Sequence, residues 1–140
     1  MSWHLDEEEF EAVQLMGAEE RYRYFIEQLV ESQEAWGLWS NEGGWWHTRD
    51  GEGNAALALW PHSRYADAFA KSMETDPTPK LIPLATLLDT FVPRLAKDGM
   101  TLAVFPVADG EGHAITPEEF REQLQSQLVD DGDEFEYDDY

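Results

Sequence analysis

The chain has 140 residues, the length of one domain, and carries 30 acidic against 9 basic side chains, a net charge of −21. This charge argues against direct binding to nucleic acid or to an anionic membrane, because both are themselves polyanions. Cysteine is absent, which excludes disulfides, thiolate metal sites and cysteine catalysis.

The first third of the chain contains two expected helices. A short helix is predicted over 7–15 and a clearer one over 18–33, with Gly17 as its N-cap. Apolar residues in the second helix recur at intervals of three and four: Tyr22, Phe25, Ile26, Leu29 and Val30. This spacing gives the helix one face to bury.

A tryptophan-rich segment follows, in which the apolar period changes to two. Strands are predicted over 35–39, 45–49 and 55–60, separated by glycine-containing turns at 41–44 and 50–54. The simplest arrangement of these strands is a three-stranded antiparallel meander.

The next segment alternates between loop and helix. Two prolines predict a loop over 72–80, and the cleanest amphipathic stripe of the chain covers 84–95. Leu88 lies at the centre of this stripe, so we expect it to be buried. Pro93 lies inside the stripe and predicts a kink or break near 89–92.

The remaining elements are marked by caps and by one doubly apolar run. Ser63 is placed as the cap of a helix, and 100–107 is predicted as a strand that is covered on both faces. Thr116, Pro117 and Glu119 have the order of a capping box that starts a last helix.

These elements predict an α+β fold, with a small antiparallel sheet packed by four to five helices. The sheet consists of the meander and the later strand. We expect an acidic N-terminal segment over 1–17, a single domain over 18–129 and an acidic disordered tail over 130–140.

Negative charge is concentrated at both ends of the chain. Five acids lie in 1–11 and seven in 130–140, while all nine basic residues lie between them. The tail either stays solvated or docks on a basic groove through residues spaced within it: Glu134, Phe135, Tyr137 and Tyr140. A third interpretation is an acidic surface suited to a salt-loving cell.

Five of the six tryptophans lie in the meander. Pairing Ser40 with Trp45 places Trp39, Trp46 and Trp60 on one sheet face, among small residues. That face is either a second packed layer or an exposed patch for a partner. A register shift of one residue would exchange the two faces. In the predicted register the core face carries Trp36, Leu38 and Trp45.

The sequence from about Glu19 to Leu128 resembles a bacterial family known only as domain of unknown function 2750. The resemblance rests on short pieces in a fixed order: Glu20–Tyr22 with Phe25, Trp36–Leu38, Gly44–Trp45, Leu59–Pro61 with Tyr65–Ala66, Ile82–Leu84, Asp98–Gly99, Val104–Pro106 and Pro117. It implies a small α+β domain and no known activity, cofactor or catalytic residue. The acidic ends lie outside it.

No catalytic motif is present. The sequence has no nucleophile elbow, no zinc-protease helix and no phosphate-binding loop. The four histidines are isolated, and the two Asp-Gly-Glu-Gly segments, 50–53 and 109–112, have the composition of turns. We therefore expect no enzyme activity, metal or cofactor.

Two functions remain in competition. The first is a non-catalytic binding protein that contacts a basic protein, as an immunity-type neutraliser or a nucleic-acid mimic. The second is a small-molecule sensor or enzyme with a pocket lined by tryptophan, His47 and His62. No apolar run reaches the roughly 20 residues of a membrane span. The N-terminus lacks the basic and apolar regions of a secretion signal, so we expect a cytoplasmic protein.

Overall fold

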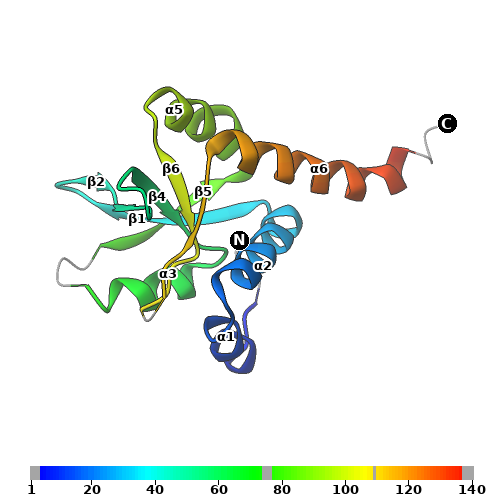
Figure 1. The fold of residues 1–140 in the computed structure, drawn as a ribbon. Coiled ribbons are helices and arrows are strands. Elements are labelled where there is room, and N and C mark those ends of the chain that lie inside the picture. The colour runs from blue at the N-terminus through cyan, green and yellow to red at the C-terminus, as the bar shows by residue number, and fades with distance from the viewer. Residues whose placement is uncertain (1–3, 74–76, 109, 137–140) are drawn as a thin grey trace.

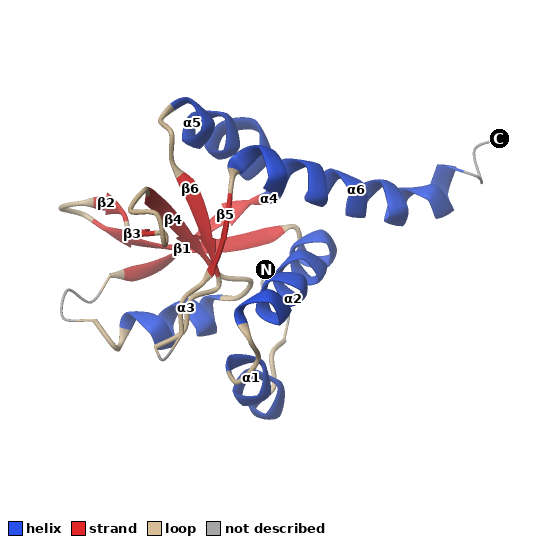
Figure 2. Cartoon of the chain, viewed as in Figure 1, coloured by secondary structure: helices blue, strands red, loops and turns tan. Residues whose placement is uncertain are grey.

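The structure is a computed structural model that describes residues 4–73, 77–108 and 110–136. Two helices are followed by four strands, and the remaining helices and strands are interspersed along the rest of the chain (Figures 1 and 2). The helices are α1 Glu7–Gln14, α2 Ala18–Ser32, α3 Ser63–Ala70, α4 Leu84–Thr86, the π-helix η1 Leu87–Phe91, α5 Val92–Lys97 and α6 Pro117–Glu136. The strands are β1 Glu34–Ser40, β2 Gly44–Trp45, β3 His47–Arg49, β4 Ala55–Leu59, β5 Thr78–Pro83, β6 Thr101–Val104 and β7 His113–Ile115.

The strands form two sheets joined at one point. The first has the order β2-β1-β5 and is antiparallel, and the second has the order β3-β4-β6-β7. Strands β4 and β6 run parallel, so the second sheet is mixed and not antiparallel as expected. Trp36 and Trp60 exchange two backbone hydrogen bonds of 2.8 Å, which connect β1 to the end of β4.

The strands of the predicted meander follow one another as expected, but they do not form one sheet: the strand expected over 45–49 breaks into β2 and β3, which belong to different sheets. The hairpin register was also wrong by one residue. Ser40 pairs with Gly44, and Trp39 pairs with Trp45. Gly44 has a φ of +74°, a conformation that glycine adopts readily and that closes a three-residue hairpin loop. The prediction had counted this glycine as part of the turn, which moved every later residue to the opposite face.

Two strands were missed. Strand β5 occupies the end of the predicted loop and pairs along β1, and β7 pairs with β6. Prolines at 77 and 79 had predicted a loop, but β5 lies at the edge of its sheet, where proline is tolerated because one side of the strand needs no ladder partner. Strand β6, in contrast, was predicted, and its Leu102 and Val104 are fully buried.

Most predicted helix ends are confirmed. Gly17 is the N-cap of α2, and the Glu119 N–H donates to Thr116 Oγ1 at 3.1 Å at the start of α6. The cap of α3 was wrong by one residue. His62 is the N-cap, and its Nδ1 accepts a hydrogen bond from the Arg64 N–H at 3.1 Å, which leaves Ser63 as the first helical residue.

The predicted break before Pro93 is confirmed as the π-helix η1. Proline has no N–H to donate and its ring clashes with the carbonyl four residues earlier, so the normal helical ladder is interrupted at this point. The interruption changes which leucine enters the core. Leu87 is fully buried, whereas Leu88, which we expected to be buried, is only partly covered.

This difference predicts unequal effects of two neighbouring substitutions. Leu87→Ala should lower the free energy of unfolding by about 2–5 kcal/mol, because it leaves a cavity in the core. Leu88→Ala should cost about 1 kcal/mol, since less of its side chain leaves water. Urea unfolding of both variants measures the difference, and equal losses would contradict the burial described here.

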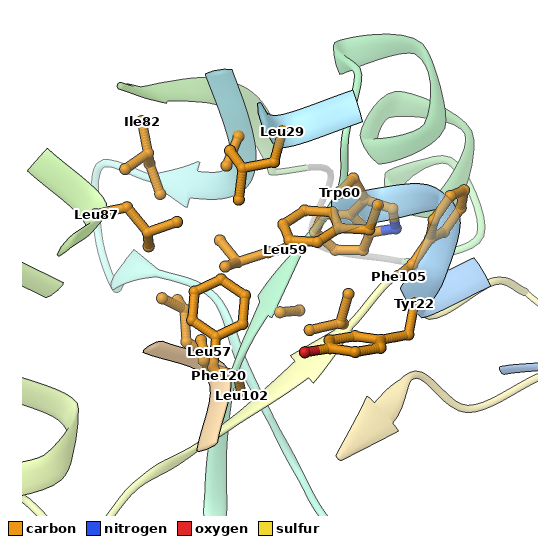
Figure 3. Close-up of a cluster of buried hydrophobic side chains, with 14 of the residues drawn as sticks. Tyr22, Leu29, Leu57, Leu59, Trp60, Ile82, Leu87, Leu102, Phe105 and Phe120 are labelled. Atoms are coloured by element: carbon orange, nitrogen blue, oxygen red, sulfur yellow. The ribbon is translucent and has the colours of Figure 1, made fainter. Parts of the chain in front are cut away.

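The core lies between the two sheets and the helices that cover them (Figure 3). Trp60, Phe25, Phe105 and Phe120 are among its largest fully buried side chains. The first segment of the chain belongs to the same core. Leu5 and Val13 are buried in it, and Arg64 of α3 forms an ion pair with Glu7 of α1.

The helix α6 extends away from the rest of the fold (Figure 1). It ends at Glu136, so the backbone over 130–136 is helical where the sequence had predicted a disordered tail. The last four residues of that tail, 137–140, lie outside the described residues. No helix in the described part of the chain is long and apolar enough to cross a membrane.

Candidate functional site

A cavity of about 420 Å³ lies between the tryptophan-rich strands and the helices η1 and α5. We call it the Trp45 pocket. Its wall is formed mainly by apolar side chains: Trp45, Leu57, Phe91, Leu95 and Met100. Four polar side chains also border it: His47, Thr90, Arg94 and Asp98. A concave, apolar space with a few polar groups is typical of small-molecule sites.

Local structure explains why these residues meet. Trp45 ends β2, and His47 begins β3 directly opposite Leu57 of β4. The π-helix carries Thr90 and Phe91 to the other side of the cavity. π-Helical turns are rare and are frequently found at functional sites.

The indole of Trp45 is held by aromatic neighbours on two sides. Its centroid lies 5.3 Å from that of Trp39 and 5.4 Å from that of Phe91, and both contacts are edge-to-face. A Cβ atom at Gly37 would lie 2.9 Å from the same ring, so the indole occupies the space that a side chain would need there. Trp45 therefore has a fixed position at the pocket wall.

Charge is distributed unevenly around the pocket. Burial lowers the pKa of His47 below its usual value, so the imidazole is neutral at pH 7 and can both donate and accept a hydrogen bond. Lys80 Nζ lies 4.0 Å from the Trp39 centroid and 5.4 Å from that of Trp45. The guanidinium of Arg94 makes no ion pair or hydrogen bond with another described residue.

The structure separates the three tryptophans predicted as a partner surface. Trp60 is 0% exposed, and its Nε1–H donates to the Pro106 carbonyl at 2.8 Å, so its assignment to a surface was wrong. Trp46 lies against Phe69 of α3, with ring centroids 5.4 Å apart. Trp39 contacts Trp45 instead, because directly paired residues share a sheet face and successive residues alternate.

Trp39 and Trp46 still border a common feature at the hairpin. Both line a wide hollow of about 860 Å³ that also contains Trp45 and His47. Trp39 and Trp46 are partly exposed there. They remain a candidate contact surface, without Trp60.

The tail residues of the predicted partner site receive less support. The backbone of Glu134 and Phe135 is part of α6. Tyr137 and Tyr140 lie outside the described residues.

The histidines do not converge. His47 borders the Trp45 pocket, whereas His62 caps α3 and His113 lies on Tyr22, with ring centroids 4.5 Å apart. No group of three potential metal ligands is found among the described residues. Of the two histidines that the sequence had suggested for a tryptophan-lined pocket, His47 borders the Trp45 pocket and His62 does not.

Parts of the two Asp-Gly-Glu-Gly segments, 50–51 and 110–112, border a second cavity of about 410 Å³, which the sequence did not suggest. Asp50 accepts hydrogen bonds from Thr101 Oγ1 and from the N–H groups of Glu52 and Asn54, each at 2.9 Å. Although partial burial opposes ionisation, these bonds outweigh it and lower the pKa of Asp50. The carboxylate is thus used to close its own turn, as expected for turn chemistry.

The fold and the pocket define a small α+β domain with one ligand-sized apolar site beside a tryptophan-rich hairpin. The profile of a protein family, described as "Protein of unknown function (DUF2750)", matches residues 22–124. The chain belongs to this family, which confirms the resemblance seen in the sequence. No curated protein and no solved structure matches the chain.

Proposed function

We propose that this protein is a non-catalytic binding protein whose ligand is a small molecule held in the Trp45 pocket. The observation that carries the proposal is the cavity of about 420 Å³ between β2, β3 and the π-helix. Its volume lies within the range of about 300–1,000 Å³ that small-molecule pockets occupy. We also propose, from the sequence, that the protein is cytoplasmic and of bacterial origin.

The lining supports binding more than catalysis. Leu57 and Leu95 are buried beneath the cavity, and Trp45 and Phe91 present partly exposed aromatic rings. Such a wall stabilises an apolar ligand by removing its surface from water. The polar groups at the rim orient a ligand, and His47 supplies a neutral imidazole for hydrogen bonding.

A pocket-filling substitution tests this proposal. Thr90 is exposed at the pocket wall, so Thr90→Trp should occupy the cavity without burying a polar group. Thr86→Trp is the matched control, because Thr86 is also exposed on the preceding helix but does not border the pocket.

Binding is followed by the indole N–H signal of Trp45 in ¹H–¹⁵N spectra, assigned with Trp45→Phe, during titration with a fragment mixture. We expect several apolar fragments to shift this signal saturably, with dissociation constants below about 1 mM. Thr90→Trp should raise the dissociation constants of these fragments at least about tenfold, and Thr86→Trp should leave them unchanged. The proposal is wrong if no fragment shifts the signal, or if the filled variant binds as the original protein does.

A basic protein is the second candidate partner. The net charge of −21 favours it, because long-range attraction accelerates association with a positively charged surface. The outer surface of α2 contributes exposed acids to this field: Glu19, Glu20, Glu27 and Glu31. This candidate includes immunity-type neutralisation and mimicry of nucleic acid, with Trp39, Trp46 and the acidic C-terminal residues as its contacts.

Association with a basic nuclease tests the second candidate. We expect the association rate to fall at least about tenfold between low ionic strength and 0.15 M, where exposed charges are screened within about 8 Å. A chain that ends at Val129 should associate more slowly at low salt, because it lacks seven acids. Replacing Phe135, Tyr137 and Tyr140 by alanine keeps that charge and is the control. No association at low salt, or a rate that salt does not change, would exclude this candidate.

A further inference from the structure

We infer that the ligand of the Trp45 pocket is an aromatic monocarboxylate whose carboxylate pairs with Arg94. This inference rests on the proposed function and names the class of ligand that the same site would take. It joins the apolar wall to the charges at its rim.

The wall accounts for the aromatic body. Trp45 and Phe91 lie edge-to-face at 5.4 Å, and Leu57 and Leu95 close the cavity behind them. Aromatic rings prefer edge-to-face or offset contacts with other rings. A flat ring of ligand can therefore contact the two aromatic side chains and the aliphatic floor at once.

Arg94 accounts for the negative charge. The chain has more than three acids for every base, and several described basic side chains are engaged: Arg23 with Glu19, Arg64 with Glu7, and Lys71 with Asp67. Arg94 borders the cavity without such a partner among the described residues. Its planar guanidinium matches the geometry of a carboxylate, and Lys80, whose Nζ lies over the Trp45 ring at 5.4 Å from its centroid, adds a second positive charge on this side of the molecule.

Asp98 limits the charge that the ligand can carry. It lies one helical turn after Arg94 and borders the same cavity. A carboxylate that pairs directly with Arg94 gains more from this pair than it loses to Asp98, whereas a further negative charge outside the pair gains less from Arg94 and is still repelled by Asp98. A carboxylate therefore fits better than a phosphate monoester.

Three probes of similar size test the inference: 3-phenylpropionate, its neutral amide and phenyl phosphate. Their dissociation constants are measured from the Trp45 indole signal. We expect the dissociation constant of the carboxylate to be at least about ten times lower than that of the amide, because only the carboxylate can form a charge-assisted hydrogen-bonded pair with Arg94. The carboxylate should also bind more tightly than phenyl phosphate. Asp98→Asn should bring the dissociation constants of the carboxylate and of phenyl phosphate closer together, because it removes the repulsion between Asp98 and the phosphate.

Arg94→Gln should abolish the preference for the carboxylate over the amide. Lys97→Gln is the matched control, because it removes an exposed positive charge from the same helix without altering the pocket wall. Equal binding of carboxylate and amide, or a preference that survives Arg94→Gln, overturns the inference and leaves the proposed function in place. Tighter binding of phenyl phosphate also overturns it. If neither these probes nor the fragments bind in the pocket, the proposed function fails as well.

Discussion

Replacing Arg21 by alanine should lower the free energy of unfolding by about 3–5 kcal/mol, one of the two largest losses we expect from a single substitution. Arg21 is only 3% exposed, although it is charged. Its guanidinium donates to the carbonyls of Phe105 at 2.9 Å and Glu111 at 2.8 Å, and also to that of Met16. Alanine would leave these three acceptors without their donor.

The arginine connects parts of the chain that are distant in sequence. Met16 follows α1, Phe105 follows β6 and Glu111 precedes β7. Phe105 has a φ of +61°, a left-handed conformation that is uncommon for a phenylalanine. The hydrogen bond from Arg21 Nε fixes the carbonyl of this residue, so one side chain holds both a helix junction and an unusual backbone turn.

Two further substitutions define this effect. Arg23→Ala is the matched control on the same helix, and it should change stability by less than about 1 kcal/mol because its ion pair with Glu19 is exposed. Arg21→Lys keeps a positive charge but not the planar guanidinium. It should therefore lower the free energy of unfolding by less than Arg21→Ala and by more than Arg23→Ala. Guanidinium chloride unfolding measures all three, and an Arg21→Ala protein as stable as the Arg23→Ala protein would contradict the prediction.

Trp60→Ala should be similarly costly, with a loss of about 3–5 kcal/mol. Trp60 is 0% exposed and packs on Phe69 with ring centroids 5.3 Å apart. Trp60→Phe preserves most of this packing but leaves the Pro106 carbonyl without its indole donor, which should cost about 1–3 kcal/mol.

Trp39→Ala is the comparison for Trp60, because Trp39 is also a tryptophan of the meander but is only partly buried. It should lose less than Trp60→Ala in the same unfolding experiment. A protein that tolerates Trp60→Ala as well as Trp39→Ala would contradict the burial of Trp60 and favour the exposed patch, one of the two alternatives that the sequence left open.

The features predicted best from the sequence are those determined by neighbouring residues. The apolar spacing from Tyr22 to Val30 predicted α2, and the Thr116–Glu119 capping pair predicted the start of α6. Pro93 predicted the break that the structure shows as η1. In each case the physical cause lies within one or two helical turns, so the local sequence contains it.

The errors arise where a distant strand or one backbone angle decides the result. The left-handed Gly44 shifts the hairpin by one residue and exchanges the roles of Trp45 and Trp46. Strand β5 exists because β1 offers it a partner, and no pattern within its own proline-containing sequence indicates that partner. The segment 130–136 is a separate case, because its backbone continues the helix α6 in spite of its charge.

The candidate site was only half predictable. Trp45 and His47 lie in the segment that the sequence singled out, but Thr90, Arg94 and Asp98 come from a helix more than forty residues later. Nothing in the sequence near Arg94 indicates that it meets Trp45. The predicted kink at Pro93 was the one available signal, since the π-helix that it produces forms the opposite wall of the cavity.

Gly37 influences the Trp45 pocket although it does not line it. The Cβ of any other residue at position 37 would lie only 2.9 Å from the Trp45 ring, which is too close for two carbon atoms that are not bonded. A methyl group there would force the indole to shift, and because Trp45 borders the pocket, the shape of the cavity would change with it. Mutagenesis confined to residues that touch the ligand would therefore overlook a position that helps to fix the pocket wall.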